Sequence, residues 1–111
     1  MTARRAVLII GVCFGGAFAA GSAPAPHVHT VLIQGFHFQP DTLTIPVGDT
    51  VEWKNADIVA HTVTADDQTF HSPLIQPNHS WKMVATKPGA HSYFCSPHPN
   101  MKGKLVISQT P

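Results

Sequence analysis

Apolar and polar residues alternate along most of the chain after about residue 30, in short segments separated by turn-forming residues. In TVLIQGFHF, Val31 and Ile33 fall on one face of an extended chain, and a bulge at Gly35 would bring Phe36 and Phe38 onto a shared face. Alternation of this kind is typical of strands that are buried on one side only. The segment therefore predicts a half-buried strand with a bulge near its end.

The rest of the body repeats this pattern. TLTIPVGDTVEWKN alternates on both sides of a turn predicted at Gly48 and Asp49, and VAHTVTA, SWKMVA, AHSYFC and GKLVIS each supply a further segment. Clusters of Pro, Gly, Asn and Asp mark the turns between them. A chain of 111 residues forms one domain at most. The pattern predicts an all-β protein of about seven to eight strands, folded as an antiparallel β-sandwich with Greek-key connections.

The N-terminal residues differ from the body. Arg4 and Arg5 precede an apolar run of about 15 residues, and small residues follow it. A basic start, an apolar run and a small-residue cleavage site are the layout of a secretory signal peptide. The run is shorter than the ~20 residues of a membrane-spanning helix, and an uncleaved anchor is the alternative reading. We predict a signal peptide over residues 1–23, cleaved after Ala19 or Ala23, and therefore export to the periplasm without stable membrane insertion.

Removal of this segment changes the charge and the cysteine content. The remaining chain carries five lysines against six acidic residues, so its net charge is near −1 with neutral histidines. This balance gives no indication of binding to nucleic acid or to an acidic membrane surface. Loss of Cys13 leaves Cys95 as a free thiol, an intermolecular bridge or a metal ligand. Residues 24–29 are expected to form a flexible linker, and residues 30–111 the folded domain.

Three candidate metal ligands are concentrated near the C-terminus. The stretch YFCSPHPNMKG places Cys95, His98 and Met101 at the spacing C-x-x-H-x-x-M, between two predicted strands. His61, in an earlier predicted strand, supplies a second imidazole. Two His, one Cys and a weak axial Met are the ligands of blue-copper centres, whereas structural zinc sites use four Cys or His ligands. Copper therefore fits this set better than zinc does.

These segments together resemble a known family. FHFQPDTLTIPVGDTVEWKNADIVAHTVTADD, followed by PGAHSYFCSPHPNMKGKLVIS, is similar to the cupredoxins of the plastocyanin, pseudoazurin and amicyanin group. The loop CSPHPNM is most similar to that of amicyanin, which also has Pro on each side of its His. The resemblance implies a cupredoxin-like, copper-binding domain with one type 1 copper ion as cofactor. It also implies four copper ligands: His61, Cys95, His98 and Met101.

The two prolines of the loop have a structural consequence. Pro97 and Pro99 restrict the backbone on both sides of His98, so the loop is expected to be stiff before metal binds. They also remove two N–H groups near the Cys95 thiolate, which leaves the N–H of Thr62 as the expected donor. Thr62 is a departure from the family, because Asn is frequent at this position.

The resemblance implies a small electron-transfer protein, not an enzyme, in which copper cycles between Cu(II) and Cu(I). His98 is expected to be the electron port, because its ring edge should reach the surface. Asn100 stands where amicyanin carries a large aromatic residue, on the face that docks redox partners. We expect a monomer that meets a c-type cytochrome or a periplasmic dehydrogenase through small, transient contacts.

Two other classes of function stay open. A periplasmic copper-binding protein for copper delivery or buffering would use the same ligands, but only Met83 and Met101 remain as thioethers after export. A copper enzyme would need an open coordination position for substrate, and this ligand set leaves none. His27 and His29 are either a weak second copper site or part of a polar tail.

Overall fold

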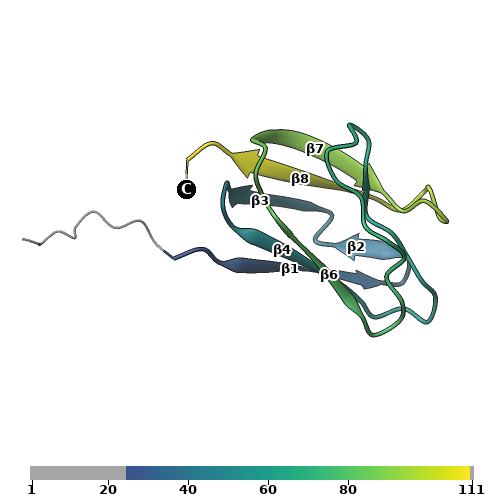
Figure 1. The fold of residues 1–111 in the computed structure, drawn as a ribbon. Helices are drawn as coiled ribbons and strands as arrows, with labels where there is room; N and C mark the ends of the chain where they lie inside the picture. The colour runs from purple at the N-terminus through teal and green to yellow at the C-terminus, as the bar shows by residue number, and fades with distance from the viewer. Residues whose placement is uncertain (1–24, 111) are drawn as a thin grey trace, which may run out of the picture.

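The computed structural model describes residues 25–110, which form eight strands in two packed sheets (Figure 1). The strands in chain order are β1 (Val28–Gln34), β2 (His37–Gln39), β3 (Thr42–Pro46), β4 (Thr50–Asn55), β5 (Thr64–Ala65), β6 (Ser80–Val84), β7 (Gly89–Phe94) and β8 (Lys102–Ser108). The predicted all-β sandwich of about seven to eight strands is confirmed. Among the described residues, no helix is long and apolar enough to cross a membrane.

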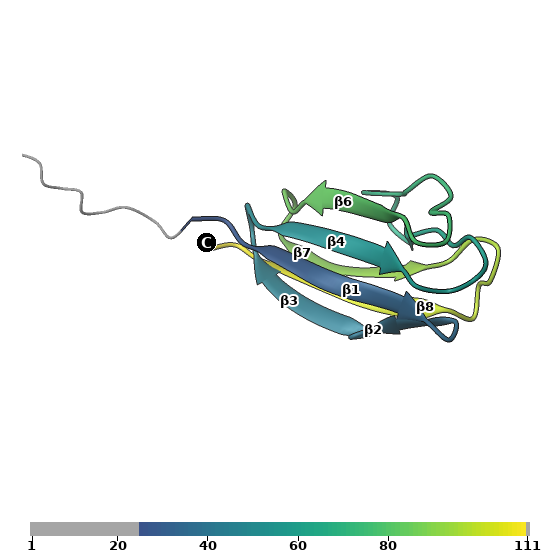
Figure 2. The ribbon, with the colours of Figure 1, turned by 90° about the horizontal axis from the view of Figure 1, so that it is seen from below.

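The pairing of the strands differs in one respect from the antiparallel sandwich that was predicted. The first sheet has the order β2-β1-β4-β6 and the second the order β3-β8-β7-β5. β1 pairs with β4 in parallel, and β3 pairs with β8 in parallel, while the other four pairs are antiparallel. The cause lies in β2 and β3, which run in the same direction while the chain crosses from the first sheet to the second (Figure 2). The chain then returns as β4 alongside β1.

The core lies between the two sheets and is built from alternate strand positions. In β1, Val31 and Ile33 are almost completely buried, and in β4, Val51 and Trp53 are completely buried. Ile45 of β3 faces them from the second sheet. The alternation in the sequence therefore identified the inward-facing side chains of these strands correctly.

An aromatic cluster occupies the centre of this core. The rings of Phe38, Trp53, Phe70 and Tyr93 lie with neighbouring centroids 4.8 to 6.2 Å apart. The indole Nε1 of Trp53 donates a hydrogen bond to the Tyr93 hydroxyl at 3.3 Å, and burial raises the pKa of Tyr93 to about 12. Gly103 lies opposite Tyr93 in the next strand, and a Cβ there would come within 2.8 Å of Cε2 of the ring. Only glycine leaves room for the tyrosine.

The link between β1 and β2 is a two-residue turn and not the bulge predicted from the sequence. Gly35 and Phe36 both have positive φ, 62° and 61°, and Gln34 pairs with His37 across them. Positive φ at both central residues is the geometry of a type I′ turn, which suits the twist of a hairpin. Phe36 therefore does not share a face with Phe38. Phe38 is buried, whereas Phe36 is 45% exposed.

The segment VAHTVTA is mostly loop, which also corrects the prediction. Only its last part, β5, is a strand, and His61 forms an isolated bridge with Ile75. The Asn55 side chain helps to hold the part that is not a strand. Its amide donates to the backbone carbonyls of Val59 and Ile75 at 2.8 Å each. A side-chain donor of this kind satisfies backbone groups that a strand ladder would otherwise pair.

The first strand begins earlier than the sequence predicted. Val28 and His29 belong to β1, although they were expected in the linker. His29 Nε2 lies 2.8 Å from Oδ2 of Asp49, and the backbone N–H of His27 donates to Oδ1 at 3.2 Å. The hydrogen bond from His29 lowers the pKa of Asp49, and the one from His27 lowers it further. These contacts fix the start of β1 against the β3–β4 turn.

A second His–Asp pair connects β7 with the turn that follows β5. His91 Nδ1 lies 2.6 Å from Oδ2 of Asp67, and its Nε2 lies 2.8 Å from the carbonyl oxygen of Lys87. The hydroxyl and the N–H of Thr69 donate to Oδ1 of Asp67. The Thr69 hydroxyl, the Thr69 N–H and His91 lower the pKa of Asp67 to about 2.

The candidate ligands lie at one end of the sandwich. The β7–β8 loop, the β1–β2 turn and the end of β4 project at the same end in both views, opposite the C-terminus and the start of β1 (Figures 1 and 2). This arrangement brings His61 and the C-x-x-H-x-x-M loop together from segments far apart in the sequence.

Candidate metal centre

Three predicted ligands meet at this end of the molecule. The Sγ atom of Cys95 lies 3.5 Å from Nδ1 of His61 and 3.6 Å from Nδ1 of His98. All three ligand atoms lie within 4.8 Å of one another. Cys95 and His61 are completely buried, whereas His98 is partly exposed. Within residues 25–110, this is the one group of at least three His, Cys, Asp or Glu side chains that is close enough to hold a metal ion.

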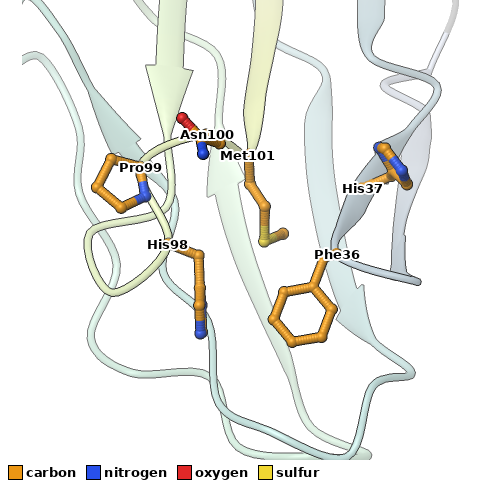
Figure 3. Close-up of a pocket in the computed structure, with 6 residues that line it drawn as sticks. All are labelled: Phe36, His37, His98, Pro99, Asn100 and Met101. Carbon is orange, nitrogen blue, oxygen red and sulfur yellow. The ribbon is translucent and has the colours of Figure 1, made fainter.

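Met101 completes the set predicted from the sequence. It is 4% exposed, and its thioether points into the same hollow as the imidazole of His98 (Figure 3). A thiolate and a thioether are soft donors that suit Cu(I), and imidazole suits copper in both oxidation states. The donor set therefore fits a copper ion better than it fits zinc.

The loop from Cys95 to Met101 is held by its own backbone. The N–H of His98 donates to the carbonyl of Cys95 at 3.1 Å, and the N–H of Met101 donates to the carbonyl of His98 at 2.9 Å. The N–H of Cys95 donates back to the carbonyl of Met101 at 3.1 Å, which closes the loop. Pro97 and Pro99 restrict the backbone between these bonds. The three side chains are therefore presented from a short, closed and rigid segment.

His61 is oriented by an aspartate that the sequence analysis did not identify. Its Nε2 lies 2.8 Å from Oδ2 of Asp57, so that Nδ1 is the nitrogen that faces Cys95. A carboxylate on the outer nitrogen of a metal-binding His fixes the tautomer and the ring orientation. Burial alone would raise the pKa of Asp57, but hydrogen bonds from the N–H groups of Phe36 and Gly35 and from His61 lower it overall. Asp57 is therefore ionised at neutral pH.

Asn55 in turn fixes Asp57. Its Oδ1 accepts the N–H of Asp57 at 2.9 Å, while its amide group holds the loop on either side of His61. Both residues lie within the segment that resembles the cupredoxins, but the sequence assigned no role to either of them. Loops commonly contain two polar residues this close together, so their position before His61 was not a specific signal.

Thr62 links the two ligand segments. Its backbone N–H donates to the Sγ of Cys95 at 3.4 Å, which confirms the donor expected from the sequence. Its hydroxyl accepts the N–H of Ser96 at 2.8 Å and lies 3.1 Å from the hydroxyl of Thr64. The threonine side chain therefore joins the segment of His61 to the residue that follows Cys95.

The histidines near the N-terminus form no comparable site in the part of the chain that the structure describes. The rings of His27 and His29 lie 6.5 Å apart, and His29 is engaged with Asp49. The second copper site that was considered for this pair has no third ligand brought within range there.

A Greek-key sandwich with a thiolate, two imidazoles and a thioether at one end has the architecture of a small blue-copper protein. Comparison with known proteins agrees. The family model described as a Cupredoxin-like domain matches residues 6–107, and the chain therefore belongs to the cupredoxin family. The resemblance stated from the sequence is confirmed. The protein is a blue-copper electron-transfer protein whose cofactor is one type 1 copper ion.

Individual relatives give the same result. Amicyanin-alpha of Methylorubrum extorquens is 31% identical over 98 residues, which cover 84% of this chain and 82% of that protein. Chloroplastic plastocyanin of Tetradesmus obliquus is 31% identical over 118 residues, which cover 94% of this chain and 81% of that protein. Among solved structures, a mutant of amicyanin in its oxidized state has a TM-score of 0.68 at 27% identity, covering 73% of this chain and 82% of that one. A purple cupredoxin from Nitrosopumilus maritimus has a TM-score of 0.68 at 30% identity, covering 72% of this chain and 99% of that one.

Proposed function

We propose that this protein is an exported one-electron carrier in which His61, Cys95, His98 and Met101 hold the copper. The observation that supports this proposal most directly is the approach of the Cys95 thiol to two imidazole nitrogens, at 3.5 and 3.6 Å. When bound, copper supplies reversible one-electron exchange between Cu(II) and Cu(I). The thioether on the remaining side favours electron transfer over catalysis, because catalysis at a metal needs an open position.

The protein contributes rigidity. The closed backbone of the β7–β8 loop, the Asp57 carboxylate on His61 and the link through Thr62 hold the donor atoms close together. A site that keeps its shape in both oxidation states needs little rearrangement when an electron enters or leaves. This is the property that an electron carrier requires.

The exposed edge of the site supports contact with a redox partner. His98 lines a surface groove of about 380 Å³ beside Phe36 and Asn100 (Figure 3). Ile58, in the loop that leads to His61, is 91% exposed and adds an apolar side chain at this end. We propose that His98 is the electron port and that a c-type cytochrome or a periplasmic dehydrogenase docks here through a small, transient interface.

Export belongs to the same proposal. The basic, apolar and small-residue segments of residues 1–23 lie outside the described residues, and their sequence supports a signal peptide. Sequencing the N-terminus of the protein recovered from the periplasm tests this. A start at residue 20 or 24 is expected, and a protein that keeps residues 1–23 would contradict it.

Spectroscopy tests the copper site. The purified protein, given one equivalent of Cu(II), should show an intense blue thiolate-to-copper band and a narrow copper hyperfine splitting in EPR. Both should disappear in Cys95→Ser and change in His98→Ala. His71→Ala is the matched control, because His71 is exposed and lies outside the cluster. A pale protein with wide splitting, unaffected by Cys95→Ser, would overturn the proposal.

A further measurement separates electron transfer from copper delivery. An electron carrier should retain copper through repeated cycles of reduction and oxidation in the presence of a moderate chelator. Rapid transfer of the ion to an acceptor protein, with loss of the blue band while the metal-free protein stays folded, would instead support a delivery function.

A further inference from the structure

Phe36 occupies a backbone position that does not suit it. It is the second central residue of the type I′ turn and has a φ of 61°, where Asn or Gly is the usual choice. A bulky side chain at positive φ is a true outlier, because Cβ crowds the backbone. The ring is also 45% exposed, so that burial in the core does not account for its presence. Strained residues of this kind gather at functional sites.

The ring of Phe36 lies against both candidate imidazole ligands. Its centroid is 5.2 Å from that of His61 and 4.9 Å from that of His98, with interplanar angles of 85° and 87°. The two imidazoles are themselves 5.0 Å apart. Edge-to-face contacts at these distances are attractive. Figure 3 shows the Phe36 ring facing the same hollow as His98 and the thioether of Met101.

One carboxylate fixes both this turn and a ligand. Oδ1 of Asp57 accepts the N–H of Gly35 at 2.7 Å, and Oδ2 accepts the N–H of Phe36 at 3.0 Å. The same Oδ2 lies 2.8 Å from Nε2 of His61. The position of the aromatic ring and the orientation of His61 are therefore set by one anchored side chain.

We propose that Phe36 is a positioning residue of the copper centre. Its ring restricts the imidazoles of His61 and His98 to the orientation that binds the ion, and it covers the ion from water on the side of the β1–β2 turn. This inference rests on the proposed assignment of both histidines as ligands. The strained backbone of the turn is the cost of placing an aromatic ring at this point.

The test removes the ring while relaxing the backbone. Phe36→Asn places a residue that tolerates positive φ in the turn, and Phe36→Tyr retains the ring. In Phe36→Asn we expect Cu(I) to pass to a chelator about ten-fold faster, as for loss of other groups that orient metal ligands. We also expect the ring NMR signals of His98 in the metal-free protein to show motion that is absent from the parent. Phe36→Tyr should match the parent both in the rate of Cu(I) transfer and in the NMR signals of the His98 ring.

The stability of the metal-free protein distinguishes positioning from a merely structural role. The thermal unfolding midpoint of metal-free Phe36→Asn should stay within about 2 °C of the parent, because relief of strain offsets the lost contacts. Gln68→Asn is the matched control: Gln68 has a φ of 65°, is exposed and lies outside the site. It should leave copper transfer unchanged. If Phe36→Asn does not fold, Phe36→Gly provides the same deletion of the ring with a residue suited to the turn.

Different results would overturn different claims. A blue parent protein whose ring-deletion variant releases Cu(I) at the parental rate would overturn this inference and leave the proposed function intact. Faster release that simply follows a lower unfolding midpoint in the metal-free variants would also overturn it. A parent protein without a blue band that depends on Cys95 would overturn the proposed function, and the inference with it.

Discussion

Replacing Asp57 by Asn tests the anchor of the metal centre with little change in side-chain shape. The carboxylate receives three donors, the N–H groups of Gly35 and Phe36 and Nε2 of His61, at 2.7 to 3.0 Å. Its side chain is 11% exposed and that of His61 is fully buried, so water cannot easily replace the bond from His61, whereas the bonds from Gly35 and Phe36 lie at the surface. The carboxamide of Asn has one acceptor oxygen in place of two. At least one donor in Asp57→Asn therefore faces an NH₂ group.

The expected losses of stability and of copper affinity in Asp57→Asn follow from these contacts. A poorly hydrated donor that is left unpaired costs about 1–3 kcal/mol. At ~2 kcal/mol, and at about 4–8 °C per kcal/mol for a domain of this size, the unfolding midpoint of the metal-free protein should fall by about 8–16 °C. Loss of the carboxylate partner of a metal-binding His should also weaken copper affinity by about 10- to 100-fold.

Calorimetry of the metal-free protein and chelator competition for Cu(II) measure the two effects. Asp66→Asn is the control, because Asp66 is an exposed residue of the turn after β5 and undergoes the same chemical change. Equal unfolding midpoints for the two variants, together with an unchanged copper affinity in Asp57→Asn, would refute the reasoning. The carboxylate would then not anchor the turn or His61.

Three further substitutions test other parts of the structure. Gly103→Ala places a Cβ against the ring of Tyr93, and we expect a loss of about 1–3 kcal/mol, measured by thermal or urea unfolding; a variant as stable as the parent would contradict the close contact. Asp67 has a pKa of about 2 in the folded protein, so its stabilisation is complete above about pH 4 and is lost as the pH falls towards 2. Asp67→Asn should flatten the fall of the unfolding midpoint over that range, and an unchanged slope would count against this assignment. Thr62→Val removes the acceptor of the Ser96 N–H and should cost about 1–2 kcal/mol in calorimetry while the blue band persists, because the donor to the thiolate is a backbone N–H. Loss of the band would show that the hydroxyl does more than link the two segments.

The parts of the structure that the sequence predicted well are those set by local pattern. Alternation placed Val31, Ile33, Val51 and Trp53 in the core, because side chains of a strand point to opposite faces in turn. The candidate ligands of the β7–β8 loop lie close together because a seven-residue loop between paired strands is too short to separate them. The Thr62 donor is an exception, because it contacts Cys95 from a segment 33 residues earlier in the chain.

The parts that were missed depend on contacts between distant segments. Asp57 acts on the turn at Gly35 and Phe36, some twenty residues earlier in the chain, and no local pattern records such a contact. The bulge predicted at Gly35 was wrong for a local reason, since a glycine in an alternating run fits a bulge or a turn equally well. The parallel pairs β1–β4 and β3–β8 are likewise a property of the crossover between sheets.

The position of β7 and β8 in the second sheet has a consequence for the metal centre. In the order β3-β8-β7-β5, both strands lie inside the sheet. The loop from Cys95 to Met101 connects these two strands, and the N–H of Cys95 donates to the carbonyl of Met101 across its ends. Three of the four candidate ligands are therefore held between two internal strands and not at a free edge of the sandwich.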